Sequence, residues 1–225
     1  MNIKAFRKPG RNPSRGSRRY EMDMTRGPLL PEILAFSGPL ILTGILQLLY
    51  NAADIVVVGR FAGATSLAAV GSTGSLINLI VNIFMGLSVG ASVMVARAYG
   101  AGDQKAVQDV VHTFILVALL SGFAVGIFGF VMARPILRWM DSPEDVIDLA
   151  ALYVRIYFLG MPFNLLYNFG AGILRAVGDT KRPLYYLTIS GAVNVVFNLI
   201  LVIAFHLDVA GVAIATGISQ AISMV

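Results

Sequence analysis

The 225-residue sequence contains no cysteine, a single tryptophan and few charged residues, which make up 13% of the chain. Without cysteine it is not a small disulfide-bonded secreted domain. Soluble domains are roughly a quarter charged, so this low charge content excludes a sizeable soluble domain. Hydrophobic residues instead make up 57% of the chain, and the mean hydropathy is +0.78. The composition therefore indicates a membrane protein.

The apolar residues form long continuous runs between residues 29 and 225. A bilayer crossing needs about 20 apolar residues, and backbone groups in hydrocarbon must be satisfied within their own segment, which favours helices. The strands of a membrane β-barrel would alternate in polarity instead. We expect an all-α polytopic membrane helix bundle with six transmembrane helices, at 33–58, 67–96, 110–132, 149–174, 184–205 and 209–225. The last run stops without a polar exit, so we expect the sequence to be a fragment.

A basic tail at residues 1–28 precedes the first apolar run, and residues 1–31 hold eight Lys and Arg against two Asp and Glu. We expect this tail to be disordered and not to bind nucleic acid, since basic cytoplasmic ends are common topology signals. All but four of the 17 Lys and Arg residues fall on the tail's side of the membrane. The exceptions are Arg60, Arg134 and Arg138 on the other side and Arg155 within a span. The positive-inside rule then predicts a multi-pass protein of the inner (plasma) membrane with a cytoplasmic amino terminus.

Asp54 is the one acidic residue that lies clearly within an apolar run. A central Asp costs ~2.5 to 3.5 kcal/mol on insertion scales, so an acid within a span is a functional hypothesis by default. It follows Gln47 and Asn51 at i, i+4 and i+7 spacing, which puts the three side chains on one helix face. The alternative interpretation is that the span ends there and Asp54 is solvated near the headgroups.

Polar side chains at helical spacing occur in four further spans. They are Asn78 and Asn82, Asn164 and Asn168, Asn194 and Asn198, and Thr216 and Gln220. Hydrogen bonds to neighbouring helices would explain each pair alone. Their presence on several helices favours a water-accessible cavity. The candidates to line it are Gln47, Asn51, Asn78, Asn82, Asn164, Asn168 and Gln220.

Two prolines, Pro39 and Pro162, lie inside predicted spans. Proline has no amide hydrogen and clashes with the preceding turn, so each should bend its helix. A static kink is favoured over a hinge.

The sequence has none of the motifs of nucleotide hydrolysis or covalent catalysis. It lacks a Walker loop, a Ser/His/Asp arrangement and paired carboxylates. His112 and His206 share no metal-ligand spacing. We therefore expect neither enzyme activity nor a cofactor.

Three stretches resemble the multidrug and toxic compound extrusion (MATE) transporters in order and spacing across residues 30–225. They are Tyr50–Arg60 with Leu67–Gly71, Gly86–Gly90 with Tyr99–Asp103, and Arg175–Pro183. That family has twelve helices in two six-helix lobes. The resemblance implies that this sequence is the amino-terminal lobe and that its partner, the carboxy-terminal lobe, is missing.

The resemblance further implies secondary active efflux of amphipathic, often cationic small molecules across a lipid membrane, driven by inward H⁺ or Na⁺. In the bacterial branch that this sequence resembles, a cation site uses an Asp in the first helix, an Asn and an Asp in the fifth and a Thr in the sixth. By position these correspond to Asp54, Asn194, Asn198 and Thr216. Asn198 departs from the pattern, because an amide replaces the carboxylate. Asp54 is then the one acid that would hold H⁺ or a Na⁺ ion.

Three other interpretations stay open at this point. A lipid-linked oligosaccharide flippase of the same superfamily would share the fold but favour a cavity rich in Arg and Lys, which the spans lack. An intramembrane enzyme would need a second acid, or a nucleophile and a base, beside Asp54. A non-transporting membrane scaffold would not explain the polar side chains at helical spacing in several spans.

Overall fold

The computed structural model describes residues 29–224; the tail expected to be disordered at 1–28 lies outside the described residues. Within them the chain is helical and has no strand, which confirms the predicted all-α fold. The elements are α1 (Leu29–Val57), η3 (Val58–Ala62), α2 (Gly63–Gly100), α3 (Gln104–Trp139), α4 (Ile147–Leu159), α5 (Met161–Ala176), α6 (Lys181–Leu199), η4 (Ile200–Ala204) and α7 (Asp208–Met224).

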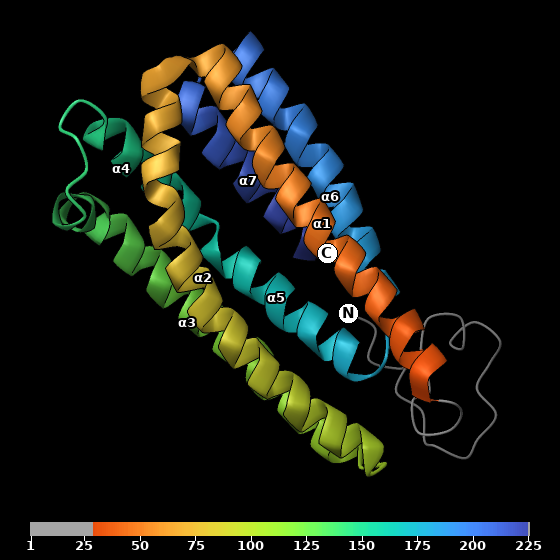
Figure 1. Ribbon diagram of the computed structural model, residues 1–225. Helices are drawn as coiled ribbons and strands as arrows, with labels where there is room; N and C mark the ends of the chain where they lie inside the picture. The colour runs from red at the N-terminus through yellow and green to blue at the C-terminus, as the bar shows by residue number, and fades with distance from the viewer. Residues whose placement is uncertain (1–28, 225) are drawn as a thin grey trace.

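Three helical stretches of the described chain are long and apolar enough to cross a membrane, and the bent pair of α4 and α5 is a fourth. The first stretch, Ile33–Gly100, consists of two antiparallel helices, because the chain folds back between α1 and α2 (Figure 1). The π-helical turn η3 and Gly63, at a φ of 85°, make this reversal. Residues with a side chain rarely adopt such a φ. With the shorter apolar helix α7, 17 residues long, and with α4 and α5 counted as one, the described residues form six helical passes of the bundle.

The predicted helix at 149–174 is broken into α4 and α5, with a bend of 50° between them. Pro162 lies in the first turn of α5 and has no amide hydrogen, so it cannot donate to the carbonyl of Phe158 four residues earlier. The bend predicted at Pro162 is thus confirmed. By contrast, α1 continues through Pro39 as one helix.

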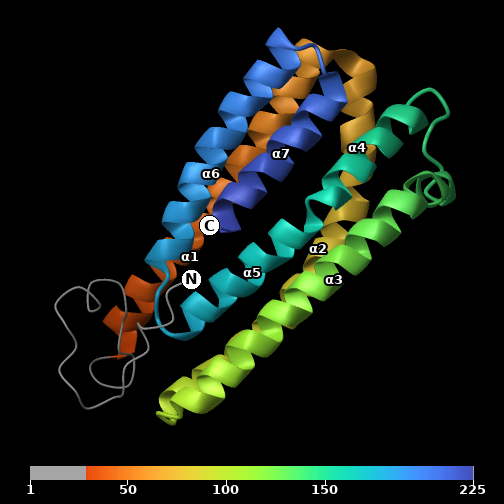
Figure 2. The same ribbon diagram turned by 180° about the vertical axis from the view of Figure 1, so that it is seen from behind.

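The helices form two groups, which Figures 1 and 2 show from opposite sides. In one group α6 packs against both α1 and α7; in the other α3 packs against α2, α4 and α5. α4 and α5 also pack against α7, which joins the two groups. Val58, Phe158 and Val212 belong to the largest cluster of buried apolar side chains, which spans both groups.

The helices α2 and α3 are longer than the apolar runs that predicted them at 67–96 and 110–132. Hydropathy marks only the part of a helix that suits hydrocarbon, whereas backbone hydrogen bonding continues into polar sequence. α3 begins at Gln104 because the carboxylate of Asp103 accepts a hydrogen bond from the amide of Ala106 at 3.0 Å. The other predicted spans agree with the observed helices to within four residues at the described ends.

Candidate functional site

Asp54 lies in the last turn of α1 and is half-buried where α1 packs against α6. Its position depends on a close approach of the two helices at Gly191, where a Cβ would lie 1.9 Å from Cζ of Tyr50. The Tyr50 hydroxyl donates to the carbonyl oxygen of Thr188 at 3.3 Å. Gly191 therefore lets the Tyr50 ring lie directly on α6. Asp54, one turn further along α1, meets the same helix.

Asp54 begins a chain of side-chain hydrogen bonds across α1, α6 and α7. Asn198 Nδ2 donates to Asp54 Oδ1 and also to Asn194 Oδ1, the latter at 3.1 Å. Asn194 Nδ2 donates to Thr216 Oγ1 at 3.4 Å, and Thr216 Oγ1 donates to the carbonyl of Val212 at 2.9 Å. The structure thus brings together the four residues that the resemblance assigned to one site, although Asp54 and Asn198 are 144 positions apart.

The surroundings of Asp54 offer oxygen ligands but no positive charge. Asn198 is fully buried, and its Oδ1 makes no hydrogen bond. Among the described residues, Arg134 pairs with Asp148 and Arg182 pairs with Asp179. Neither of these ion pairs includes Asp54. An unpaired carboxylate in an apolar environment is costly. A proton or a bound cation would neutralise Asp54, and the free Oδ1 of Asn198 would serve a hard cation as a ligand.

Two tyrosines of α4 lie within electrostatic reach of Asp54, and the sequence did not reveal them. Tyr153 and Tyr157 are buried or half-buried within reach of its charge, with ring centroids 6.1 Å apart. The side chain of Gln220 on α7 lies near Tyr157, and its Oε1 is buried without a hydrogen-bond partner. Their i, i+4 spacing was the available signal, but tyrosine in a span is equally typical of a membrane-interface residue. The packing of α4 against α7 is what brings them to the site.

The predicted cavity-lining residues of the first two helices, Gln47, Asn51, Asn78 and Asn82, are all exposed. Gln47 and Asn51 share a helix face with Asp54, yet of the three only Asp54 is covered. α1 and α2 therefore present polar groups on the outside of the described bundle, among exposed leucines and isoleucines.

The predicted residues of α5 are bonded to each other. Asn168 Nδ2 donates to the carbonyl oxygen of Asn164 at 2.9 Å and to its Oδ1 at 3.0 Å. Ser88 of α2 donates to the carbonyl of Asn168 at 3.0 Å. Hydrogen bonding within and between helices, the simpler interpretation of this pair, accounts for these contacts. Gln220, the remaining candidate, lies beside Tyr157 as described above.

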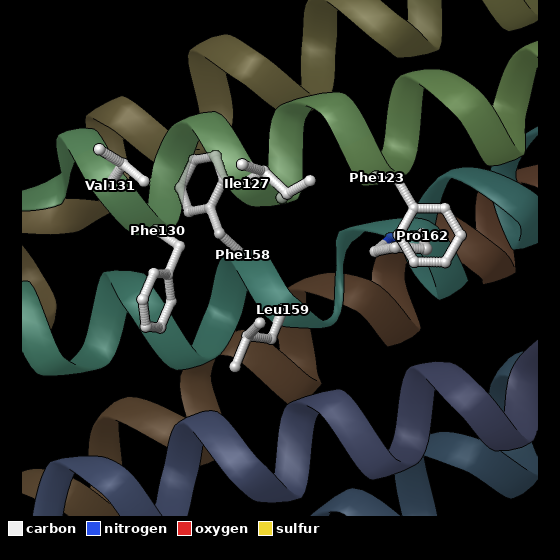
Figure 3. Close-up of a pocket in the computed structure, with 8 residues that line it drawn as sticks. Phe123, Ile127, Phe130, Val131, Phe158, Leu159 and Pro162 are labelled. Carbon is white, nitrogen blue, oxygen red and sulfur yellow. The ribbon is translucent and has the colours of Figure 1, made fainter.

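A cavity of about 210 Å³ lies between α3 and the junction of α4 and α5 (Figure 3). Its lining is apolar and includes three phenylalanines, Phe123, Phe130 and Phe158. None of the residues predicted from the sequence to line a cavity belongs to it. It is therefore separate from the hydrogen-bonded chain at Asp54.

Comparison with known proteins identifies the family. The MatE family model matches residues 39–200, more than half of the chain. The chain is 30% identical over 203 residues to the probable multidrug resistance protein YpnP of Bacillus subtilis, and 35% identical over 188 residues to the probable multidrug resistance protein YoeA of the same species. These alignments cover 89% and 82% of this chain. The chain belongs to the MATE family, in agreement with the resemblance of its motifs.

Solved structures agree with the sequence relatives. A crystal structure of MATE in complex with MaD3S superposes with a TM-score of 0.81 at 30% identity, over 88% of this chain and 44% of that chain. A MOP superfamily transporter from Pyrococcus furiosus gives a TM-score of 0.82 at 30% identity, with the same coverage. The curated relatives YpnP and YoeA are covered over 45% and 41% of their length. The chain thus spans a little under half the length of the relatives it matches.

Proposed function

We propose that this chain forms the amino-terminal lobe of a secondary active multidrug exporter driven by inward H⁺ or Na⁺. Its membership of the MATE family and its relatives named as multidrug resistance proteins support export of small molecules. Amphipathic, often cationic compounds are the proposed substrates. The proposed partner is a carboxy-terminal lobe, which corresponds to the part of the relatives that this chain does not cover.

The observation that carries this proposal is the hydrogen-bonded chain from Asp54 through Asn198 and Asn194 to Thr216. Asp54 is the acid of this site, and it meets an amide and not a cation. An ion can drive a conformational change only if it binds the two conformations unequally. Asp54 lies where α1 packs on α6, so gain and loss of its charge would alter the fit of these two helices. H⁺ or Na⁺ on Asp54 would thereby favour one arrangement of the lobe over the other.

The test uses a protein that joins this chain to a carboxy-terminal lobe of the family. In membrane vesicles with an imposed H⁺ or Na⁺ gradient, Asp54→Asn should abolish gradient-driven efflux while expression and substrate binding are kept. Asp109→Asn is the matched control, because Asp109 is an exposed acid on α3. Applying the two gradients separately identifies the coupling ion. Full efflux by Asp54→Asn would contradict the proposal and leave Asp54 as a solvated helix end.

The alternative functions receive less support. A flippase for lipid-linked oligosaccharides would place cationic side chains in the site, but Arg155 of α4 lies over the ring of Phe130 instead. An intramembrane enzyme would need a second acid, or a nucleophile and a base, beside Asp54, whereas the side chain that bonds Asp54 is the amide of Asn198. Neither alternative is named among the relatives described above.

A further inference from the structure

The apolar cavity beside α3 has a defined shape. Phe123 and Phe130 of α3, Phe158 and Leu159 of α4, and Pro162 of α5 bound it. Phe130 reaches from α3 toward α4, and Phe158 reaches from α4 toward α3 (Figure 3). Its volume of about 210 Å³ exceeds the ~150 Å³ at which an engineered apolar cavity binds benzene. The cavity is therefore large enough for a segment of hydrocarbon chain.

The backbone at the helix break builds this cavity. Its lining comes from both sides of the break, since Phe158 and Leu159 precede it and Pro162 follows it. A Cβ at Gly122 would lie 2.6 Å from the Cα of Pro162, and one at Gly126 would lie 2.9 Å from the carbonyl oxygen of Phe158. These two glycines let α3 lie against the break. The close contact of α3 with the break therefore sets the position of the hollow, whose walls are the side chains described above.

The cavity opens on a face that suits hydrocarbon. Between residues 114 and 133 of α3, every exposed side chain is apolar. Phe123, Ile127 and Val131, which line the cavity, are each more than half exposed. The exposed faces of α1 and α2 differ, because they carry amides such as Asn51 and Asn78. The α3 face is thus the lipid-facing flank of the bundle, and an acyl chain is the natural occupant of an apolar hollow there.

A positive charge lies at the edge of the same cavity. The guanidinium carbon of Arg155 lies 5.7 Å from the ring centroid of Phe130, which is part of the lining. The Nε of Arg155 is buried without a hydrogen-bond partner among the described residues, and neither of their ion pairs includes Arg155. Arg134, one turn along α3 from Phe130, is already paired with Asp148 at 2.9 Å. Arg155 is therefore a free donor for an anion at the end of the cavity nearest the α3–α4 loop.

The direction of the Arg155 side chain fits a headgroup contact. Side chains of a helix lean toward its amino-terminal end, and α4 begins at the α3–α4 loop. Long basic side chains extend in this way from hydrocarbon to the headgroups. Arg155 would thus point toward the phosphates of the leaflet on the loop side, while the cavity runs from Phe130 deeper into the bilayer.

We propose that this cavity binds an anionic phospholipid, with one acyl chain between α3 and the α4–α5 junction and the phosphate paired with Arg155. The phosphate accepts charge-assisted hydrogen bonds from the terminal nitrogens of the guanidinium. The acyl chain fills the hollow lined by Phe123, Phe130 and Leu159. This lipid site is independent of the ion coupling proposed for Asp54.

The test measures lipid binding by fluorescence quenching in vesicles of phosphatidylcholine that contain either brominated phosphatidylglycerol or brominated phosphatidylcholine. The reporter protein carries Trp139→Phe, which removes the single native tryptophan, and Phe123→Trp at the cavity mouth. Quenching of the tryptophan introduced by Phe123→Trp should give an association constant for phosphatidylglycerol about tenfold above that for phosphatidylcholine. One charge-assisted hydrogen bond produces a change of this size. Arg155→Gln should remove this preference, and Arg155→Lys should keep part of it.

Two matched controls separate the cavity from general surface effects. Leu116→Trp puts the reporter on the same exposed flank of α3 but outside the cavity lining, and it should show no lipid preference. Arg138→Gln removes an exposed arginine near the same end of α3 and should leave the preference at position 123 unchanged. Circular dichroism of Arg155→Gln should match the parent protein.

Three results would overturn the proposal. Equal association constants for the two lipids at position 123 would exclude an anionic headgroup. An unchanged preference in folded Arg155→Gln would exclude the arginine. Protection of position 123 from both brominated lipids, with cross-linking between chains at this face, would show that a second copy of the chain covers the cavity.

Discussion

At the scale of single residues, the site depends on one acid and one amide. Asp54 alone would be an uncompensated charge near apolar side chains, and Asn198 supplies it with a single hydrogen bond. The amide oxygen of Asn198, Oδ1, is buried and accepts no hydrogen bond. A buried polar group without a partner lowers the stability of the folded protein by about 1 to 3 kcal/mol. A cation held by both Asp54 and Asn198 Oδ1 would remove both costs, and the Asn198 amide would have to turn its oxygen toward Asp54 to bind it.

Asn198→Asp should strengthen Na⁺ binding, because it puts a second carboxylate next to Asp54. The two negative charges repel each other without a cation and both attract a bound one. The expected result is a melting temperature that rises with Na⁺ concentration more steeply than in the parent chain, as ligand linkage requires. Asn164→Asp is the control, since it makes the same change on α5 beside Asn168. An identical Na⁺ response of Asn198→Asp and the parent would contradict the site.

At the scale of helices, glycine determines how closely neighbours approach. Gly122, Gly126 and Gly129 face α4 and α5, and a Cβ at any of them would lie less than 3 Å from an atom of those helices. Gly86 and Gly90 of α2 have the same spacing in sequence, but no atom lies within 4 Å of their Cβ positions. The glycines of α3 therefore allow close helix packing, whereas Gly86 and Gly90 of α2 contact no neighbouring helix among the described residues.

Gly122→Ala should destabilise the chain by about 1 to 3 kcal/mol, the usual cost of overpacking. The atom that a Cβ would meet is the backbone Cα of Pro162 at 2.6 Å, which cannot move aside as a flexible side chain would. Gly86→Ala should be neutral or stabilising, because Ala exceeds Gly in helix propensity by about 1 kcal/mol. Unfolding of the purified chain in detergent, followed by circular dichroism, measures both. Equal stability of the two variants would contradict the close approach of α3 to α5.

At the scale of the whole molecule, the bundle has two unlike exposed faces. The α3 flank is apolar, whereas α1 and α2 expose Gln47, Asn51, Asn78 and Asn82. Amides facing lipid are unfavourable unless they are bonded or hydrated. The polar face is therefore the side on which the second lobe of the proposed exporter would pack.

We predict that the 225-residue chain expressed alone confers no drug resistance on a susceptible bacterial strain, because a pathway between two lobes needs both. The same chain joined to a carboxy-terminal lobe should confer resistance. Growth at graded drug concentrations, with membrane expression of both proteins verified, is the measurement. Resistance from the single lobe would contradict the prediction unless cross-linking showed that two copies assemble.

The orientation in the membrane stays a prediction from the distribution of Lys and Arg. Ala101 and Ser142 lie beyond opposite ends of α3. In intact cells, a membrane-impermeant thiol reagent should label Ser142→Cys and should label Ala101→Cys only after the cells are opened. The native chain has no cysteine, so each variant carries a single reactive thiol. Labelling of Ala101→Cys from outside would reverse the predicted topology.

Much of the architecture was predictable from the sequence. Apolar runs marked the spans, because only helices satisfy the backbone in hydrocarbon, and Pro162 marked the bend between α4 and α5. The runs did not mark where α2 and α3 end, since helical hydrogen bonding continues into polar sequence. Nor did they show that α1 and α2 are joined by a helical turn, η3, and not by an extended loop.

The amino-acid sequence alone is enough to predict an all-α membrane bundle, and its motifs point to the MATE family and to Asp54. Composition and helical periodicity depend on residues close together in the sequence, so they can be recognised before any distant contact is known. Which polar residues meet depends on how the helices pack: Asn198 donates a hydrogen bond to Asp54, whereas Asn51, on the same helix face as Asp54, is exposed. Helix packing likewise brings Tyr153 and Tyr157 within electrostatic reach of Asp54 and forms the cavity near Arg155. A helical repeat fixes the face of a side chain, but the neighbour that the face meets depends on residues far away in the chain.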